Sequence, residues 1–159
     1  LAIAEFLAEE FPQLNLWPQD RLMRARARSI SAEMHAGFAN LRSQCGMNIK
    51  LRLQGAPLSD AVQADISRIS KAWADARAMP GSDTGPYLFG QFSIADTMYA
   101  PVVWRFFSYN IALPTVAAQY VQTMLAHPAM QEWERAALKE TSVIRHYDDD
   151  ALARFGGSR

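Results

Sequence analysis

The stretch "EMHAGF", residues 33–38, holds a carboxylate and an imidazole two positions apart. Glu33 and His35 flank the apolar Met34, and at about 100° per residue a helix cannot turn both of them toward a core. An exposed carboxylate can meet a cationic group of a ligand, and an imidazole can exchange a proton near neutral pH. As isolated residues, both are explained equally well as ordinary surface side chains.

A second stretch, "SIAD", places Ser93 and Asp96 three positions apart at the start of an apolar run. This is the pattern of a capping box, in which the serine oxygen accepts from the N–H of Asp96 and the carboxylate accepts from the N–H of Ser93. The negative charge also suits the positive end of a helix dipole. We therefore predict a structural role for this pair, as the N-capping box of a helix.

Basic residues gather in one part of a chain that is neutral as a whole. The chain has 16 basic and 16 acidic residues, yet residues 21–52 carry seven bases and one acid. Arg21, Arg24 and Arg28 would share one face of a helix, as in some proteins that bind nucleic acid. The aromatic residues and framework of such proteins are missing, so a solvated face or a dimer rim is the favoured interpretation.

The sequence shows no pattern of a metal site, a disulfide or a membrane span. Cys45 is the single cysteine, which fits a reducing compartment, and we expect it to be a small buried hydrophobe. His127 and His146 are too isolated to ligate a metal together. No apolar run approaches the roughly 18 residues that a membrane helix needs.

Helices must position these residues, because the sequence lacks the alternation of polar and apolar residues that is typical of strands. Residues 1–10 are predicted as a helix that ends at a linker with Pro12 and Pro18. Asp20 would cap the next helix, residues 21–44. Its apolar positions recur every three or four residues, at Met23, Ala27, Ile30, Met34, Phe38, Leu41 and Cys45.

The central part of the chain predicts two more helices. Ser59 would cap the first. Its buried stripe would consist of Val62, Ile66, Ile69, Trp73 and Ala76. A loop rich in proline and glycine leads to the second, residues 94–109. Pro101 must bend or loosen that helix near Thr97, which either opens room for a pocket or merely fits the core.

The last part of the chain completes a predicted all-α fold. Pro114 and Pro128 mark the first turns of two further helices. Residues 148–159 are polar and rich in glycine, and we expect a flexible tail there. The prediction is a bundle of five main helices, preceded by a part of another helix.

Four stretches resemble the glutathione S-transferase family in the order that the family has. "GQFSIADTMYAPVVWRF" is similar to the N-capping motif of the buried central helix of the C-terminal domain. "LAIAEFLAEEFPQLNLWP" resembles the last helix and linker of the thioredoxin-like N-terminal domain, "RARARSISAEMHAGFANLR" the first long helix of the C-terminal domain in bacterial members, and "HPAMQEWERAA" its final helix. The resemblance implies that residues 1–16 belong to a truncated glutathione-binding domain and residues 17–147 to the helical domain.

The resemblance also implies roles for individual residues. "EMHAGF" is similar to the Glu-Leu-His-Lys-Gly-Phe stretch of beta-class bacterial enzymes. By this resemblance, Glu33 meets the amino group of glutathione bound to the partner subunit, and His35 donates toward the thiolate. Ala36 stands where the family has lysine, and Arg28 where it has asparagine on that helix.

A hydrophobic substrate pocket is implied between the first and third helices of the helical domain. Its candidate residues are Met34, Phe38, Tyr99, Trp104 and Phe107, each of which is explained equally by core packing. The residue that activates the sulfur, a Ser, Cys or Tyr in the family, is expected upstream of Leu1. We therefore expect this chain alone to have no catalytic residue and to be inactive.

The resemblance implies a cytoplasmic homodimer that uses glutathione as co-substrate in detoxification. The complete enzyme would conjugate glutathione to a small hydrophobic electrophile, or use it otherwise, without a metal. Two other interpretations stay open: a protein-interaction module of the same fold, and nucleic-acid binding through the arginine face, which a net charge of zero does not favour.

Overall fold

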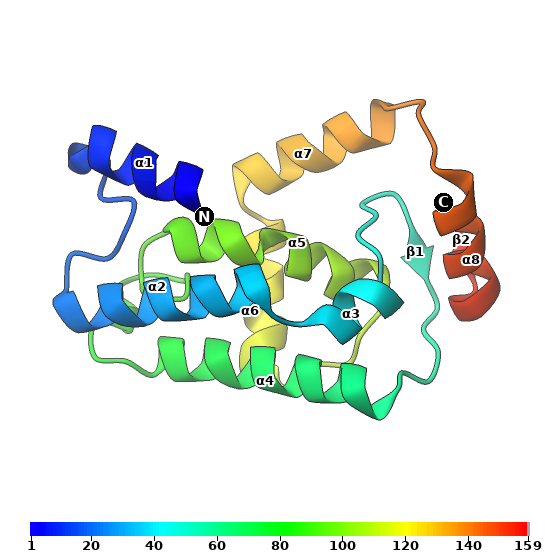
Figure 1. Cartoon of the computed structure of the whole chain (residues 1–159), viewed down its shortest axis with the longest axis horizontal. Coiled ribbons are helices and arrows are strands. Elements are labelled where there is room, and N and C mark those ends of the chain that lie inside the picture. Colours follow the sequence, from blue (N-terminus) through cyan, green and yellow to red (C-terminus); the bar gives the residue numbers. More distant parts are fainter. Residues whose placement is uncertain (159) are drawn as a thin grey trace.

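A computed structural model describes residues 1–158 and consists mostly of helices (Figure 1). The helices are α1 (Ala2–Glu10), α2 (Arg21–Ala36), α3 (Ala39–Gln44), α4 (Asp60–Arg77), α5 (Ile94–Ser108), α6 (Thr115–Leu125), α7 (Pro128–Lys139) and α8 (Arg145–Phe155). Two short 3-10 helices, Pro12–Leu14 and Ser82–Thr84, lie in the connections. The strands β1 (Arg52–Leu53) and β2 (Gly157–Ser158) pair antiparallel. The predicted all-α fold class is confirmed.

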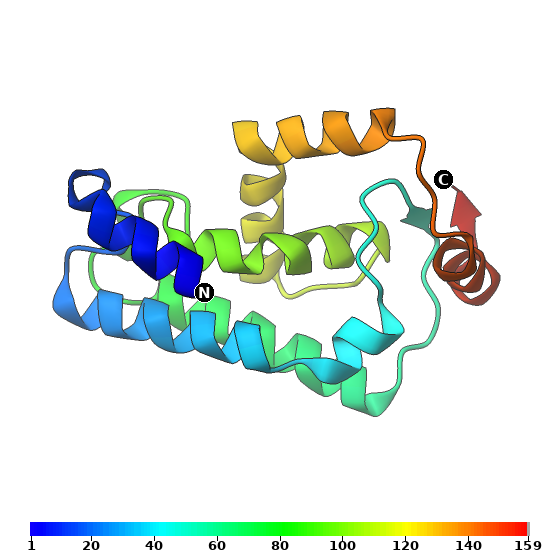
Figure 2. The same ribbon diagram turned by 45° about the horizontal axis from the view of Figure 1, so that its top comes forward.

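The core lies between α2, α4, α5 and α6, with α5 at its centre. Helix α5 packs on α2 and on α6, and α4 packs on α2, α3 and α6. Trp73 of α4 fills the middle, with the rings of Tyr99, Phe106 and Tyr120 at centroid distances of 5.5, 5.5 and 4.7 Å. Helices α7 and α8 lie outside this group, and α1 lies above the first turns of α2 (Figures 1 and 2).

The helix caps that the sequence predicts for α2, α4 and α5 are present. Asp20 accepts from the N–H groups of Leu22 and Met23 at 2.9 and 2.8 Å, and Ser59 accepts from Val62 at 3.4 Å. Helix α5 has its capping box and continues through Pro101. None of the described helices is both long and apolar enough to cross a membrane.

The single helix predicted for residues 21–44 is wrong, because the structure has two helices there. Gly37 ends α2, and Phe38 takes a left-handed φ of 59° before α3 begins. A Cβ at position 37 would lie 2.7 Å from the carbonyl oxygen of Glu33, so this tight helix end requires glycine. Phe38, at this break between the two helices, is buried.

Residues 148–158, which we expected in a flexible tail, instead form most of α8 and all of β2. Asp148, Ala151 and Phe155 are buried, although the segment is polar as a whole. Gly157 has a φ of +118°, and a Cβ there would lie 2.1 Å from the carbonyl oxygen of Arg52. Close approach of the two strands therefore depends on a glycine that the sequence suggested as a sign of flexibility.

Candidate functional site

The end of α2 presents Glu33 and His35 on the surface of the bundle. The guanidinium of Arg68 on α4 donates two hydrogen bonds of 2.7 Å to the carboxylate of Glu33, one to each oxygen. This bidentate geometry fixes the carboxylate more firmly than an ordinary surface pair. The His35 side chain is exposed. The structure therefore brings Glu33 together with Arg68, a partner that no local pattern of the sequence indicated.

The carbonyl groups that end α2 are satisfied by a neighbouring arginine. The guanidinium of Arg42 donates to the carbonyl oxygens of Met34 and His35, the latter at 3.2 Å. A cation at this place suits the negative end of the helix dipole. Arg42 thus holds α3 against the end of α2 across the break at Gly37.

Most residues of the expected hydrophobic pocket lie inside the bundle. Met34, Phe38, Tyr99 and Trp104 are buried, while Phe107 is 37% exposed. The Tyr99 hydroxyl donates to the carbonyl of Ile30 at 3.2 Å, and burial raises the pKa of Tyr99. These contacts join α5 to α2, so the rings serve the packing of the two helices.

Trp104 is the member of this group with an unused polar atom. Its indole N–H is buried and has no hydrogen-bond partner within residues 1–158. The ring lies 6.0 Å from that of Phe107 and 6.5 Å from that of Trp133 on α7, centroid to centroid. Trp104 and Phe107 therefore lie next to each other where α5 meets α7.

Asp96 is the most extensively bonded carboxylate of the bundle. One oxygen accepts from the N–H of Leu88 at 3.1 Å and from the Tyr120 hydroxyl at 2.9 Å. The other accepts from the N–H and the hydroxyl of Ser93 at 2.9 and 3.0 Å. Burial raises the pKa of Asp96, against the effect of the four donors. Asp96 of the predicted capping pair therefore also joins α5 to α6, through Tyr120, and to the loop before α5, through Leu88.

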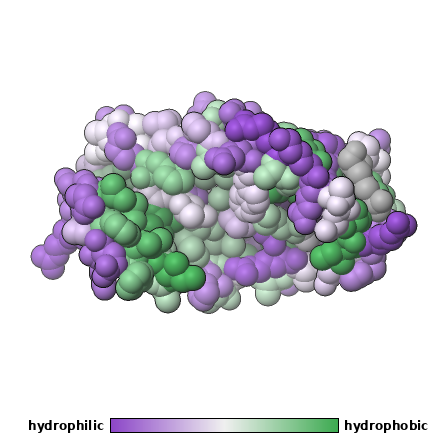
Figure 3. All heavy atoms as spheres, turned by 90° about the horizontal axis from the view of Figure 1, so that it is seen from above, coloured by the Kyte–Doolittle hydropathy of each residue, from purple (hydrophilic) through white to green (hydrophobic). Residues whose placement is uncertain are grey.

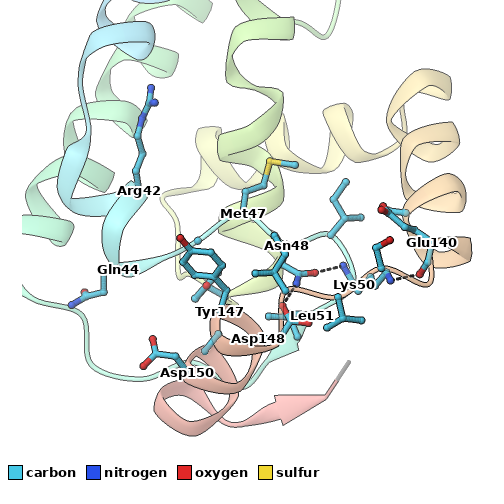
Figure 4. A pocket seen from close by; sticks show the side chains of 18 of the residues that line it. Arg42, Gln44, Met47, Asn48, Lys50, Leu51, Glu140, Tyr147, Asp148 and Asp150 are labelled. Carbon is cyan, nitrogen blue, oxygen red and sulfur yellow. Dashed lines mark hydrogen bonds between the residues drawn. The ribbon is translucent and has the colours of Figure 1, made fainter.

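A cavity of about 800 Å³ lies at the other end of the molecule, between α3, the segment after it, α7 and α8 (Figure 4). Its size is within the range of small-molecule sites. Apolar side chains from four separate parts of the chain line it, among them Met47, Tyr109, Trp133, Val143 and Tyr147. No residue of the expected hydrophobic pocket is among its lining residues in the described chain.

Polar contacts tie the C-terminal part of the chain across this cavity. Asn48 donates to the carboxylate of Asp148 at 2.6 Å, and the Lys50 amine donates to the carbonyl of Glu140 (Figure 4). Nearby, the guanidinium of Arg52 pairs with Glu134 of α7 at 2.6 Å. The walls of the cavity are thus held together by residues up to 100 positions apart.

Arg52 also stabilises the segment that forms one wall of the cavity. Its guanidinium donates to the carbonyl oxygens of Ile49 and Leu51 at 2.6 and 2.9 Å and lies 4.6 Å from the centre of the Phe107 ring. One side chain therefore links the segment before β1 to both α5 and α7. Sequence reasoning gave this residue no role, because its partners on α5 and α7, Phe107 and Glu134, lie far away in the chain.

Cys45 is fully buried beside this region, as predicted. Burial raises the pKa of its thiol to about 11, with Arg154 and Arg105 opposing the rise. A thiol with so high a pKa is a poor nucleophile at neutral pH. Within residues 1–158, no group of three His, Cys, Asp or Glu side chains is arranged to hold a metal ion.

Comparisons with known proteins agree with this architecture. Residues 54–136 match the family described as "Glutathione S-transferase, C-terminal domain". A solved structure of a glutathione transferase homolog from Burkholderia (BGR1), with bound glutathione, is similar at a TM-score of 0.60 and 25% identity, over 87% of this chain. The match spans 65% of that protein's chain. No curated protein matched. More than half of the chain thus carries the helical domain of one family, and the chain belongs to the glutathione S-transferase family.

Proposed function

We propose that this chain is the electrophile-binding and dimer-forming part of a bacterial, beta-like glutathione transferase of the cytoplasm. The observation that carries the proposal is the family match over residues 54–136. The complete enzyme adds the thiolate of glutathione to a small hydrophobic electrophile. Holding both reactants together and favouring the thiolate are the main contributions that such a site makes to the rate.

The exposed face of α1 supports the proposal that residues 1–16 belong to a second, glutathione-binding domain. Ile3 and Phe6 are 78% and 60% exposed, and α1 has no buried residue. Figure 3 shows hydrophobic surface at the end of the molecule where α1 lies. Apolar patches of this kind mark surfaces that another protein part covers. A thioredoxin-like domain before Leu1 would cover it and would supply the activating residue.

Glu33 is the residue through which one subunit would complete the glutathione site of its partner. Arg68 holds the carboxylate through one contact to each oxygen, at 2.7 Å. Each oxygen retains a second acceptor position, which a cationic amino group can use. The exposed Ala32 and Ala36 leave room for a partner helix to approach. His35 would donate toward the thiolate from the same surface.

Phe107 is the residue of the expected electrophile pocket that a substrate reaches most directly. It is the exposed member of the group, beside Trp104 with its unpaired indole N–H. We propose that Met34, Phe38 and Tyr99 shape this pocket from behind, through the packing of α2 on α5. A hydrophobic electrophile would then lie on the exposed part of the Phe107 ring.

Turnover assays separate the complete enzyme from this chain. We expect the full-length protein to be a homodimer that conjugates glutathione to a chlorinated nitrobenzene, and the 159-residue chain to be inactive. Glu33→Gln in the full-length protein should weaken glutathione binding by up to about a hundredfold. Glu132→Gln, a change at an exposed carboxylate of α7, is the control.

Two results would contradict this proposal. Measurable turnover by the 159-residue chain would place the activating residue within it. A dimeric Glu33→Gln variant with unchanged glutathione affinity would leave Glu33 as the surface partner of Arg68. The pairing of these two residues also suits a helical protein-interaction module without transferase activity, which a full-length protein that fails to bind glutathione would favour.

A further inference from the structure

Two arginines of the arginine face that the sequence predicts make contacts within the chain. Arg24 donates to two carbonyl oxygens of the linker, at 3.0 and 2.7 Å, and so holds the linker against α2. The guanidinium of Arg28 lies 5.6 Å from the centre of the Trp17 ring and pairs with the carboxylate of Glu5 on α1 at 3.0 Å. Because Arg28 stands where the family has asparagine, the family resemblance does not imply this contact.

Glu5 joins these two side chains to α1. One of its carboxylate oxygens accepts from the indole N–H of Trp17 at 3.1 Å and from Arg28 at 3.0 Å. Each of the three side chains therefore contacts the other two. Hydrogen bonds to a carboxylate are roughly twice as strong as those between neutral groups. Among residues 1–158, Glu5 is the only α1 side chain that hydrogen-bonds to the helical domain.

Trp17 is held in place by the helical domain. It is 6% exposed and belongs to the core. The carbonyl of Leu16, next to it, accepts from the N–H of Ile94 at the start of α5, at 2.9 Å. The core thus sets the position of the Trp17 ring, and Glu5 is the part of the contact that α1 contributes.

Helix α1 has few other contacts that could fix its position. It has nine residues, none of them buried, and no side chain caps its first turn. Leu1, Ala4 and Ala8 are partly buried against the core. A cavity of about 270 Å³ lies beside the helix, lined by residues of α1, the linker and α2. A helix this short is marginal by itself in water, so its place depends on the contacts that it makes.

We propose that Glu5, Trp17 and Arg28 form a latch that fixes α1 on the helical domain and so positions the chain that precedes Leu1. The second part rests on the proposed function, in which a glutathione-binding domain continues into α1. The latch then sets how far glutathione lies from the electrophile, and a shift of about 1 Å can cost roughly a hundredfold in rate. Glu5 and Arg28 are positioning residues, because they contact neither reactant.

Amide exchange of the 159-residue chain, followed by NMR, tests the latch without the second domain. Glu5→Gln and Arg28→Gln should each speed exchange of the α1 amides and of the Trp17 indole N–H by about three- to tenfold, because α1 opens more often. Exchange in α5 should stay the same. The controls are Glu10→Gln and Arg21→Gln, which remove the same charges at exposed positions of the same two helices and should change neither rate.

Turnover of the full-length protein tests the positioning. We expect Arg28→Gln to lower kcat about tenfold, more than it raises the KM of either substrate, because the latch acts on how the two reactants are placed. Its melting temperature should equal that of Arg21→Gln. The double variant Glu5→Gln/Arg28→Gln should lose no more than the weaker single variant, because either change opens the latch.

Three results would overturn the inference. Unchanged exchange in α1 of both variants would show that the apolar contacts alone hold the helix. An equal rise in α1 and α5 would show a general loss of stability instead of a latch. Faster exchange in α1 with an unchanged kcat of full-length Arg28→Gln would remove the positioning role. An inactive unmutated protein would contradict the proposed function instead, and the exchange rates would still decide whether the latch exists.

Discussion

Asp96 should be the carboxylate on which folding of this domain depends most. Its removal in Asp96→Ala deprives the N–H groups of Leu88 and Ser93 and the Tyr120 hydroxyl of their acceptor. The Asp96 side chain that these three donors bind is fully buried. A buried donor left unpaired costs about 1–3 kcal/mol, so three of them predict a loss of roughly 3–9 kcal/mol. This is a large part of the ~5–15 kcal/mol that stabilises a typical domain.

Urea unfolding followed by circular dichroism measures this loss. Asp96→Asn is the informative companion, because an amide has one acceptor oxygen while the two backbone donors bind different oxygens of the carboxylate. We expect its loss to lie between those of Asp96→Ala and of Glu132→Ala, an exposed carboxylate removed as a control. If Asp96→Ala unfolds at the same urea concentration as Glu132→Ala, the reasoning about buried donors is refuted.

Three smaller perturbations test other parts of the structure. The raised thiol pKa of Cys45 predicts stability that is fully present below pH 9 and is lost as the pH rises through about 11, by up to about 3 kcal/mol. A Cys45→Ala variant with an equally steep loss across this range would contradict this prediction. His127 caps α7 by accepting from the N–H of Ala129 at 3.2 Å. Thermal unfolding should therefore show a loss of stability of about 0.5–2 kcal/mol for His127→Ala and a smaller loss for His127→Asp. Gly37→Ala should lower the melting temperature, because the added methyl group meets the Glu33 carbonyl, whereas the same change at the exposed Gly46 should have little effect.

The sequence was sufficient to predict the elements that local interactions define. The caps at Asp20, Ser59 and Ser93 each depend on a side chain and a backbone group two or three residues apart. Apolar spacing identified the helices of the core for the same reason, since each stripe lies within one helix. The all-α architecture followed from these elements together.

The parts that could not be predicted depend on distant contacts. The bond between Asn48 and Asp148 joins residues 100 positions apart, and no periodicity indicates it. Glu33 and Arg68 are each compatible with an unpaired surface position when considered alone. The break at Gly37 depends on the close approach of this residue to the Glu33 carbonyl, which the sequence alone does not show.

The pairing of β1 with β2 has a consequence for the order in which the chain folds. Arg52 lies opposite Ser158, so the pair closes a loop of more than half the chain through two residues on each strand. Only a few contacts offset the entropy cost of closing such a loop. Helices α2, α4 and α5, in contrast, pack together through contacts between residues that are closer in the sequence. The C-terminal segment should therefore dock last and open first in the native state, with faster amide exchange in α8 than in α5. Local opening of this segment would widen the cavity while the helical core stays folded.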